Sequence, residues 1–427
     1  MKPISILLLF STVAFSTGSG AVYTLDSLHS LARQHYPQTR QLSLISQNGA
    51  IAIQNVNSNF IPKVTLSGSA SYQSEVSKMN LPPSVRFSIP ESPADNGKAG
   101  VEITQLVSDF GASNVQRQIE KLSTRNDSLK VESDLLKVYS QINSIFTDIA
   151  IAKESEKILL YTKSDLEARR DVVSTAVKAG TALSSVLQEL DAEILGVNEK
   201  MIENTSREST LYSTLSRLVN MSIDTSSVLQ LPPVDTSLVG EISERSDYYQ
   251  LEIQKQLCDK RIAFITLSTM PRLSVYGSGY YGRPGMDIYN TDMHYFGIAG
   301  VNLSWPISGN FSNIAQKRSL AGTKNIIDVQ ESMLQLSINI QLSKLKDDIA
   351  KLKQLIILDD QIANIRTQVK NIAIAQYESG AITTADYVAK LDAESAALAN
   401  KKIHLIQLTM VYVEYKTTLG KTDWSIK

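Results

Sequence analysis

Two long stretches without glycine or proline constrain this chain more than any other feature. The first runs from residue 112 to residue 179, and the second from residue 323 to residue 379. Glycine and proline disfavour a helix interior more than other residues do, so both stretches can form continuous helices. At 1.5 Å per residue, the first would extend about 100 Å. Helices of this length need neighbours along their whole length, because intrinsic propensity contributes little stability.

Apolar residues within both stretches follow the 3-4 spacing of a coiled-coil seam. They are Leu135, Val138, Ile142, Ile145 and Ile149 in the first stretch, and Leu342, Leu345, Ile349, Leu352 and Ile356 in the second. Each stretch is followed by a glycine, Gly180 or Gly380, which suits the left-handed conformation that ends many helices. We expect return helices at about 183–218 and 383–418, which would complete two antiparallel hairpins.

The second half of the chain repeats the plan of the first half. Three short segments recur in the same order: Pro62–Ser69 as Pro271–Ser278, Gly100–Thr104 as Gly300–Ser304, and Leu190–Glu193 as Leu391–Glu394. Each half is therefore expected to hold a helix, a strand pair, a very long helix and a return helix. The first helix should start near Thr24, a residue type favoured at N-caps, and run towards Asn59. Its counterpart should begin near Ser243 and end before Pro271.

Four segments alternate apolar and polar residues with the period of a strand. They pair as Val64–Tyr72 with Lys98–Ser108, and as Leu273–Tyr281 with Phe296–Trp305. We expect one apolar face, carrying Val64, Leu66, Tyr72, Val101, Ile103, Leu273, Val275, Val301, Leu303 and Trp305. Such strands between turn-rich loops are what a membrane barrel needs, although their length does not exclude a soluble two-stranded ribbon. Tyr72, Tyr276, Tyr280, Tyr281 and Tyr289 near the strand ends fit either an aromatic girdle or generic strand propensity.

Residues 1–21 have the composition of a secretory signal peptide. Lys2 supplies the positive charge, Ile4 to Val13 is a short apolar run, and Ser19, Gly20 and Ala21 suit cleavage. No later apolar stretch is long enough for a transmembrane helix, so the mature chain either stays soluble or enters a membrane as a β-barrel. We expect residues 22–427 to form one domain of two repeats, at about 22–220 and 240–420. A linker at about 221–240 would join them.

The composition and motifs favour no catalytic or cofactor chemistry. The net charge of −1 argues against nucleic-acid binding, and the single Cys258 excludes an internal disulfide. The four histidines, His29, His35, His294 and His404, lack metal-ligand spacing. Residues 277–282 match G-x-G-x-x-G, but a turn rather than a helix follows them. We therefore expect no cofactor, no metal site and no enzymatic activity.

Four strands cannot close into a barrel by themselves, because the smallest membrane barrels have about eight strands. Open sheet edges are not tolerated in lipid, since each unpaired backbone group there costs several kcal/mol. If the strands enter a membrane, several chains must pool them.

This order of elements resembles the TolC family of outer-membrane factors over nearly the whole mature chain. Gln105–Gly111 resembles the family's Q-x-L-x-D-x-G segment, and Glu244–Tyr248 resembles the start of its second half. The resemblance implies a mainly α fold with four transmembrane strands per chain. Three chains would form a 12-stranded β-barrel and an α-helical tunnel in the outer membrane of a Gram-negative bacterium. It also implies a passive exit duct for tripartite efflux or type I secretion, extending into the periplasm.

The resemblance also implies where partners act. Gly180 and Gly380 match the family's hairpin tips, and the family aspartate that helps to close the tips matches Asp386, with Val186 at the corresponding position of the first half. Adaptor docking and gating would then fall to Gly180, Gly380, Thr383, Thr384 and Asp386. The implied partners are two further copies, a periplasmic adaptor (membrane fusion) protein, an inner-membrane pump and outer-membrane lipid. The alternative is a periplasmic coiled-coil scaffold or adaptor protein, which would not need two strand pairs.

Overall fold

The computed structural model describes residues 21–76, 93–233, 244–287, 290–307 and 310–421. Residues 1–20 of the expected signal peptide (1–21), Tyr289 and residues 234–240 of the expected linker lie outside this range. The chain forms two compact units. The helical unit comprises Met1–Thr39, Asp134–Arg245 and Ser337–Lys427, and the sheet unit comprises Arg40–Ser133 and Ser246–Leu336. Each unit therefore contains segments from both halves of the sequence.

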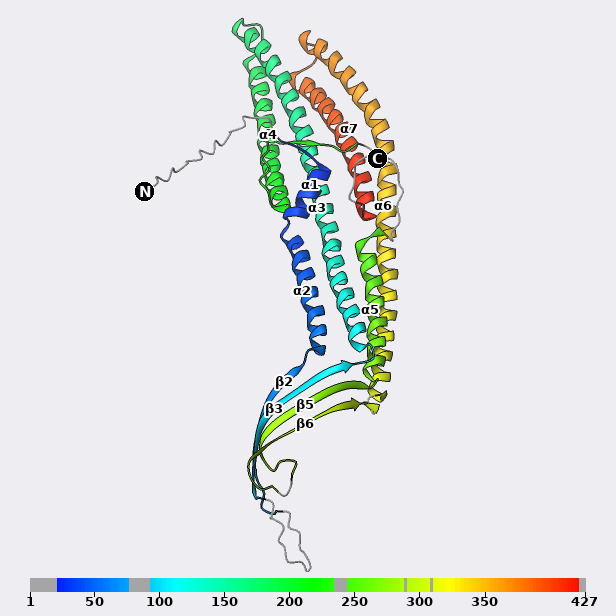
Figure 1. The fold of residues 1–427 in the computed structure, drawn as a ribbon. Helices are drawn as coiled ribbons and strands as arrows, with labels where there is room; N and C mark the ends of the chain where they lie inside the picture. Colours follow the sequence, from blue (N-terminus) through cyan, green and yellow to red (C-terminus); the bar gives the residue numbers. More distant parts are fainter. Residues whose placement is uncertain (1–20, 77–92, 234–243, 288–289, 308–309, 422–427) are drawn as a thin grey trace, which may run out of the picture. The chain divides into compact units, whose positions relative to one another are not determined.

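A four-stranded antiparallel sheet lies at one end of the helices of the sheet unit (Figure 1). Its strands are β2 (Lys63–Tyr72), β3 (Asp95–Ser108), β5 (Arg272–Arg283) and β6 (His294–Ser304). They lie in the order β2-β3-β5-β6, so the hairpin of the first half pairs with the hairpin of the second half. The sequence predicted all four strands, with β3 starting three residues earlier than expected.

The one-turn helix η2 (Ser58–Phe60) precedes β2, and four α-helical segments complete the sheet unit. These are α2 (Arg40–Asn57), α5 (Ser246–Ser268), the first part of α3 (Ala112–Lys178) and the first part of α6 (Asn310–Glu378). Ion pairs hold α5 against α6, from Lys255 to Asp328 at 2.7 Å and from Lys324 to Asp259 at 2.9 Å. α6 starts well before residue 323, where the sequence placed it, because it continues through Gly322. A glycine in a helix interior costs only about 0.5–1 kcal/mol relative to alanine.

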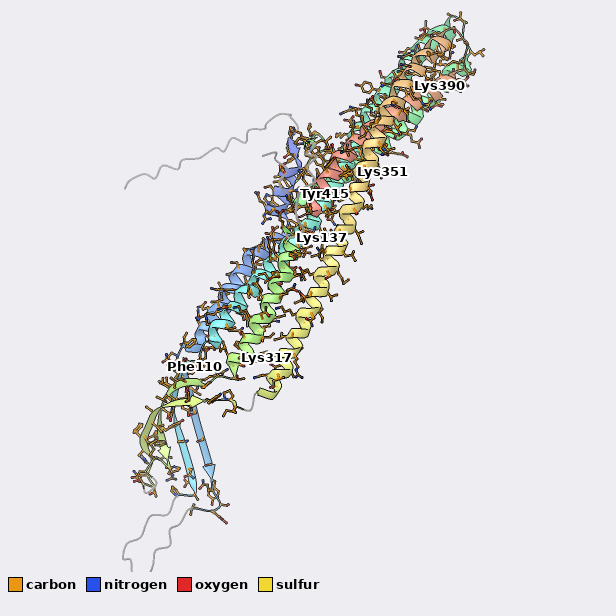
Figure 2. The ribbon with its side chains drawn as sticks, turned by 90° about the vertical axis from the view of Figure 1, so that its right-hand side faces the viewer. Phe110, Lys137, Lys317, Lys351, Lys390 and Tyr415 are labelled. Carbon is orange, nitrogen blue, oxygen red and sulfur yellow. The ribbon has the colours of Figure 1, made fainter. Side chains whose placement is uncertain are left out.

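Two antiparallel helical hairpins build the helical unit, as the sequence predicted. α4 (Ser184–Val219) returns along α3, joined to it by Arg170–Asp191 at 2.8 Å and Arg207–Asp148 at 3.2 Å. α7 (Thr384–Thr418) returns along α6, joined to it by Lys370–Glu394 at 2.9 Å. Figure 2 labels Lys390 near the start of α7 and Tyr415 near its end. The ammonium group of Lys346 in α6 lies 5.9 Å from the centre of the Tyr415 ring.

The predicted seams are the buried faces of the long helices. Leu135, Ile142 and Ile149 of α3 are fully buried in a core that also contains residues of α1, α4 and α7. In α6, Leu342, Ile349 and Leu352 are buried, whereas Leu345 and Ile356 are half-buried. The 3-4 spacing therefore identified the packed face in both halves.

The expected single helix from Thr24 to Asn59 is wrong, because the chain breaks at Pro37. α1 (Leu25–His35) begins at the predicted cap Thr24, which forms a capping box with Ser27. Tyr36 is extended with ψ 129°, a conformation that a following proline favours, and the one-turn helix η1 (Pro37–Thr39) leads into α2. A short parallel pair of strands, β1 (Val22–Thr24) and β4 (Val228–Gln230), was not expected. This pair attaches the linker to the start of the chain.

His29 belongs to a buried hydrogen-bonded network within the helical unit. Its Nε2 lies 2.9 Å from Oδ1 of Asn143, and the Asn143 amide donates to Glu414 at 3.1 Å and to Thr417 at 2.9 Å. The network thus links α1, α3 and α7. Burial lowers the pKa of His29 to about 4, although its hydrogen bonds with Asn143 and Tyr139 act in the opposite direction.

This low pKa predicts that acid destabilises the helical unit. The folded state has a pKa of about 4 and the unfolded state about 6.5, so stability is complete above pH 6.5 and is lost as the pH falls towards 4. The loss should be on the order of 3 kcal/mol per chain. We expect His29→Gln, which places a hydrogen-bonding amide beside Asn143 but cannot titrate, to flatten the fall in melting temperature between pH 7.5 and 4.5. Identical pH profiles for the variant and the wild type would contradict this role of His29.

Candidate functional site

The register of the sheet gathers the predicted apolar residues on one face. Across β2 and β3, Val64 pairs with Ile103 and Leu66 with Val101. Across β5 and β6, Leu273 pairs with Leu303 and Val275 with Val301. Directly opposed residues share a face of an antiparallel sheet. Because Ile103 and Val101 in turn oppose Gly277 and Gly279 of β5, the apolar side chains of all four strands lie on the same side.

This apolar face is open to solvent in the single chain. Leu66 is 82% exposed, and Val64 and Val301 are each 66% exposed. Aromatic residues lie at both ends of the face. At the loop end are Tyr72, Tyr281 and Tyr295, and at the helix end is Trp305, whose indole donates a hydrogen bond to the carbonyl of Thr269 at 3.1 Å. A continuous exposed apolar surface of this kind marks an interaction site.

The opposite face of the sheet is polar. Tyr276 and Tyr280 lie on it, so these two tyrosines are not part of the aromatic ends of the apolar face. The Tyr280 hydroxyl donates to the carboxylate of Glu102, and the Lys98 ammonium group lies 5.0 Å from the centre of the Tyr280 ring. The sequence did not separate the two groups of tyrosines, because both occur near strand ends.

The sheet has two open edges within the described chain. β2 pairs only with β3, and β6 pairs only with β5. An edge strand presents a row of unpaired N–H and C=O groups that can accept a further strand. With two such edges and one exposed apolar face, this sheet has unpaired backbone groups and an uncovered apolar surface in the described part of the single chain.

The hairpin tips of the helical unit have matching backbone geometry. Gly180 has φ 70° and Gly380 has φ 73°, as expected for glycines that end helices in the left-handed conformation. The next N–H donates back to the last turn, from Thr181 to Ala176 at 2.9 Å and from Ala381 to Gln376 at 2.8 Å. The duplication seen in the sequence therefore extends to the conformation of the turns.

The two return helices begin differently. Thr383 caps α7 in a capping box with Asp386, and the two reciprocal backbone-to-side-chain bonds are both 3.2 Å long. Hydrogen bonds from the Thr383 side chain and backbone lower the pKa of Asp386. Leu183, at the same position before α4, forms no side-chain cap and is 73% exposed. Thr384 is buried, with its hydroxyl 3.4 Å from that of Tyr377.

A contact between the two hairpins lies close to the tips and was not predicted. The fully buried Tyr387 of α7 donates its hydroxyl to the Asp165 carboxylate of α3. Burial, together with this bond, raises the pKa of Tyr387 to about 12. Arg169 of α3 pairs with Glu378 of α6 at 2.8 Å, and its guanidinium group lies 5.6 Å from the centre of the Tyr387 ring. No local pattern signals this contact, because its partners come from opposite halves of the chain.

Within the described residues, no group of His, Cys, Asp and Glu side chains could hold a metal ion. The described helices include none that combines the length and apolarity needed to cross a bilayer. Cys258 is a buried free thiol, and burial raises its pKa.

Solved structures with the same fold include several outer-membrane channels. The outer membrane protein VceC of Vibrio cholerae aligns with a TM-score of 0.68 at 13% identity, over 93% of this chain and 96% of VceC. The Campylobacter jejuni CmeC outer membrane channel aligns with a TM-score of 0.65 at 15% identity, over 93% of this chain and 86% of CmeC. The open state of the Neisseria gonorrhoeae MtrE outer membrane channel aligns with a TM-score of 0.65 at 14% identity, over 94% of this chain and 91% of MtrE.

No protein-family model matches the sequence, and no curated protein matches it significantly. The shared architecture nevertheless covers almost the whole chain. The expected resemblance to the TolC family is thus confirmed at the level of the fold.

The different caps predict a different response to substitution at the two tips. Thr383→Ala should weaken the start of α7 by about 1 kcal/mol, the typical loss for an N-cap hydroxyl. Hydrogen exchange of the amides at 384–390 should therefore become faster. Leu183→Ala is the matched control and should leave exchange at 184–190 unchanged, because Leu183 makes no capping bond. Equal acceleration at both tips would show that the capping box does not stabilise α7.

Proposed function

We propose that this chain is the outer-membrane subunit of a passive exit duct for efflux or type I secretion. The observation that supports this most strongly is the apolar, open-edged sheet, which occurs in a fold shared with outer-membrane channels. Its apolar face suits lipid, and its aromatic ends suit the two boundaries of a membrane, where aromatic girdles occur. The duct performs no catalysis and carries no cofactor.

Three copies would satisfy the sheet edges. β6 of one copy would pair with β2 of the next, and three sheets of four strands would give a closed 12-stranded barrel. Closure removes the unpaired backbone groups that lipid cannot satisfy. The polar face of the sheet then faces the interior of the barrel.

An exposed seam on α6 supports assembly with further copies. Ile326, Val329, Met333, Leu336 and Ile340 follow the 3-4 spacing of a coiled coil, and all are at least 59% exposed. α6 follows β6, the edge strand that would meet the next copy. We therefore assign this α6 seam to contact with a neighbouring copy, continuing the strand pairing.

The helical hairpins would extend this duct into the periplasm as a tunnel of coiled coils. We assign adaptor docking and gating to the hairpin tips, with Gly180, Gly380, Thr383, Thr384 and Asp386. A periplasmic adaptor protein would connect the tips to an inner-membrane pump. The alternative, a soluble periplasmic scaffold, leaves the apolar face of the sheet unexplained.

The assembly is tested by native mass spectrometry of protein extracted from the outer membrane in mild detergent. We expect a trimer. Met333→Glu combined with Leu336→Glu should shift it to smaller species, because charges would be buried in the α6 seam. Gln335→Glu, on another face of α6, is the control and should remain trimeric. A folded wild-type monomer would contradict the proposed function.

The contact between Tyr387 and Asp165 predicts a second function at the tips, as a latch that keeps the hairpins together. Tyr387→Phe removes the hydroxyl and leaves the Asp165 carboxylate without this donor. We expect the resting conductance of the trimer in planar bilayers to rise. Tyr377→Phe is the matched control, because the Tyr377 hydroxyl contacts Thr384 of its own hairpin. Unchanged conductance in assembled Tyr387→Phe protein would remove this contact from the gate.

A further inference from the structure

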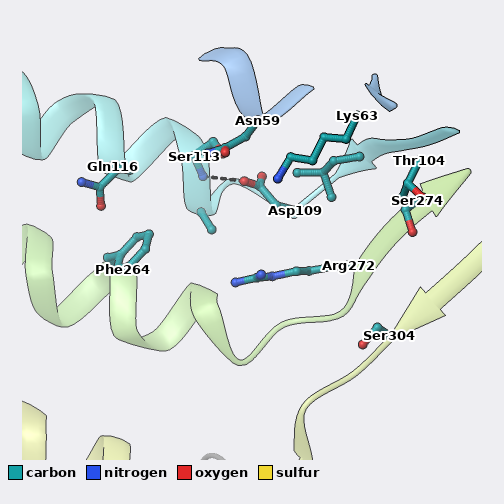
Figure 3. A pocket seen from close by; sticks show the side chains of 12 residues that line it. Asn59, Lys63, Thr104, Asp109, Ser113, Gln116, Phe264, Arg272, Ser274 and Ser304 are labelled. Atoms are coloured by element: carbon teal, nitrogen blue, oxygen red, sulfur yellow. Dashed lines mark hydrogen bonds between the residues drawn. The ribbon is translucent and has the colours of Figure 1, made fainter. Parts of the chain in front are cut away.

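The polar face of the sheet carries a pocket where the strands meet the helices of the sheet unit. The pocket has a volume of about 410 Å³. Figure 3 shows the side chains of Lys63, Asp109 and Arg272 extending into the same space. Phe264 of α5 forms an aromatic side of the pocket. Hydroxyl and amide groups complete the polar lining, from Asn59, Thr104, Ser113, Gln116, Ser274 and Ser304.

The single carboxylate of the pocket is already engaged. Asp109 is buried and accepts hydrogen bonds from the backbone N–H of Ser113 at 2.7 Å and of Gly111 at 3.1 Å. The positive φ angles of Phe110 (52°) and Gly111 (100°) turn the chain from β3 into α3 and hold this geometry. Figure 2 labels Phe110 at this turn. The negative charge of Asp109 is therefore directed at the first turn of α3.

The two cationic side chains of the pocket, Lys63 and Arg272, differ from Asp109 in this respect. Across the residues that the structure describes, neither Lys63 nor Arg272 forms an ion pair. Lys63 comes from β2 and Arg272 from β5, so the fold brings cations from both sequence halves to one pocket. A guanidinium group can bind a carboxylate or phosphate through two parallel hydrogen bonds, and an ammonium group adds a compact charge.

Positive side chains outnumber negative ones across the polar face of the described strands. Lys98 also lies on the polar face, whereas Glu102 on that face accepts the Tyr280 hydroxyl. The strands thus present Lys63, Lys98 and Arg272 against Glu102 on this side. A cleft with an excess of one sign of charge raises the local concentration of ions of opposite sign.

We propose that the pocket at Lys63 and Arg272 is an anion site that makes the duct prefer small organic anions, with carboxylate as the recognised group. This rests on the proposed function, because the polar face meets the solute only in a closed assembly. Each copy would contribute one pocket, so three sites would lie at the same level of the interior. Phe264 would contact the apolar part of a bound carboxylate.

The experiment measures ion selectivity of the purified trimer in planar bilayers under a KCl gradient. We expect the wild type to favour Cl⁻ over K⁺, and millimolar potassium succinate on one side to reduce the KCl current. Lys63→Gln combined with Arg272→Gln should lower the Cl⁻/K⁺ permeability ratio several-fold and abolish the effect of succinate. Lys63→Arg combined with Arg272→Lys, which keeps both charges, should retain the anion preference.

The control is Arg283→Gln, which removes one positive charge from the apolar face of the same sheet and should leave selectivity unchanged. Two results would overturn the proposed site: wild-type trimers that conduct without anion preference, or a Cl⁻/K⁺ permeability ratio that is the same in the Lys63→Gln and Arg272→Gln double variant as in the wild type. A trimer that never conducts, even with Tyr387→Phe, contradicts the duct itself. The two failures are thus distinguishable. If the double variant does not assemble, Lys63→Gln alone should lower the ratio, and an unchanged ratio there would also overturn the site.

Discussion

The unpaired edges of β2 and β6 are the constraint on which the account depends. A soluble sheet can leave its edges to water, but its apolar face must be covered. A sheet in lipid can expose its apolar face, but its edges must be paired. Among the residues that the structure describes, this sheet has two open edges and one exposed apolar face, with Leu66 82% and Val301 66% exposed. Pairing with further copies in a membrane, as proposed, would satisfy both requirements together.

The duplication of the chain explains why its functional features come in unequal pairs. Both halves supply a strand hairpin, a long helix and a glycine turn with nearly the same φ angle. The two repeats then differ in the side chains at their hairpin tips. The second tip has the capping box of Thr383 and Asp386, whereas the first has the exposed Leu183. The Tyr387 hydroxyl of the second hairpin donates to the Asp165 carboxylate of the first, so this hydrogen bond joins the two repeats.

Much of this fold could be predicted from sequence, because the signals are local and periodic. The absence of glycine and proline gave the extent of α3, and period-two alternation gave the apolar face of the sheet. The helix break at Pro37 was missed because the amphipathic pattern continues on both sides of it. The start of α6 was placed too late because Gly322 is tolerated in the helix. The pairing of β1 with β4 involves only three residues per strand, too few to show a pattern.

The candidate sites were less predictable than the fold, because their partners are distant in the sequence. The Tyr387–Asp165 contact and the pocket at Lys63 and Arg272 each join the two halves. A lysine that begins one strand and an arginine that begins another resemble ordinary polar strand ends until the register is known. The sequence could suggest Asp386 near the start of a helix, but only the structure shows its capping partner.

Cysteine crosslinking between edge strands tests the central claim most directly. With Cys258 replaced by serine, one cysteine is fixed at Ser67 in β2, and a second is moved along β6 from Ile298 to Leu303. If neighbouring copies pair edge to edge, crosslinked dimers and trimers should form in the outer membrane. They should form only at alternate positions, those on the polar face with Ser67, because successive strand residues face opposite sides. Crosslinks at no position, or without alternation, in a protein that still folds would contradict the shared sheet.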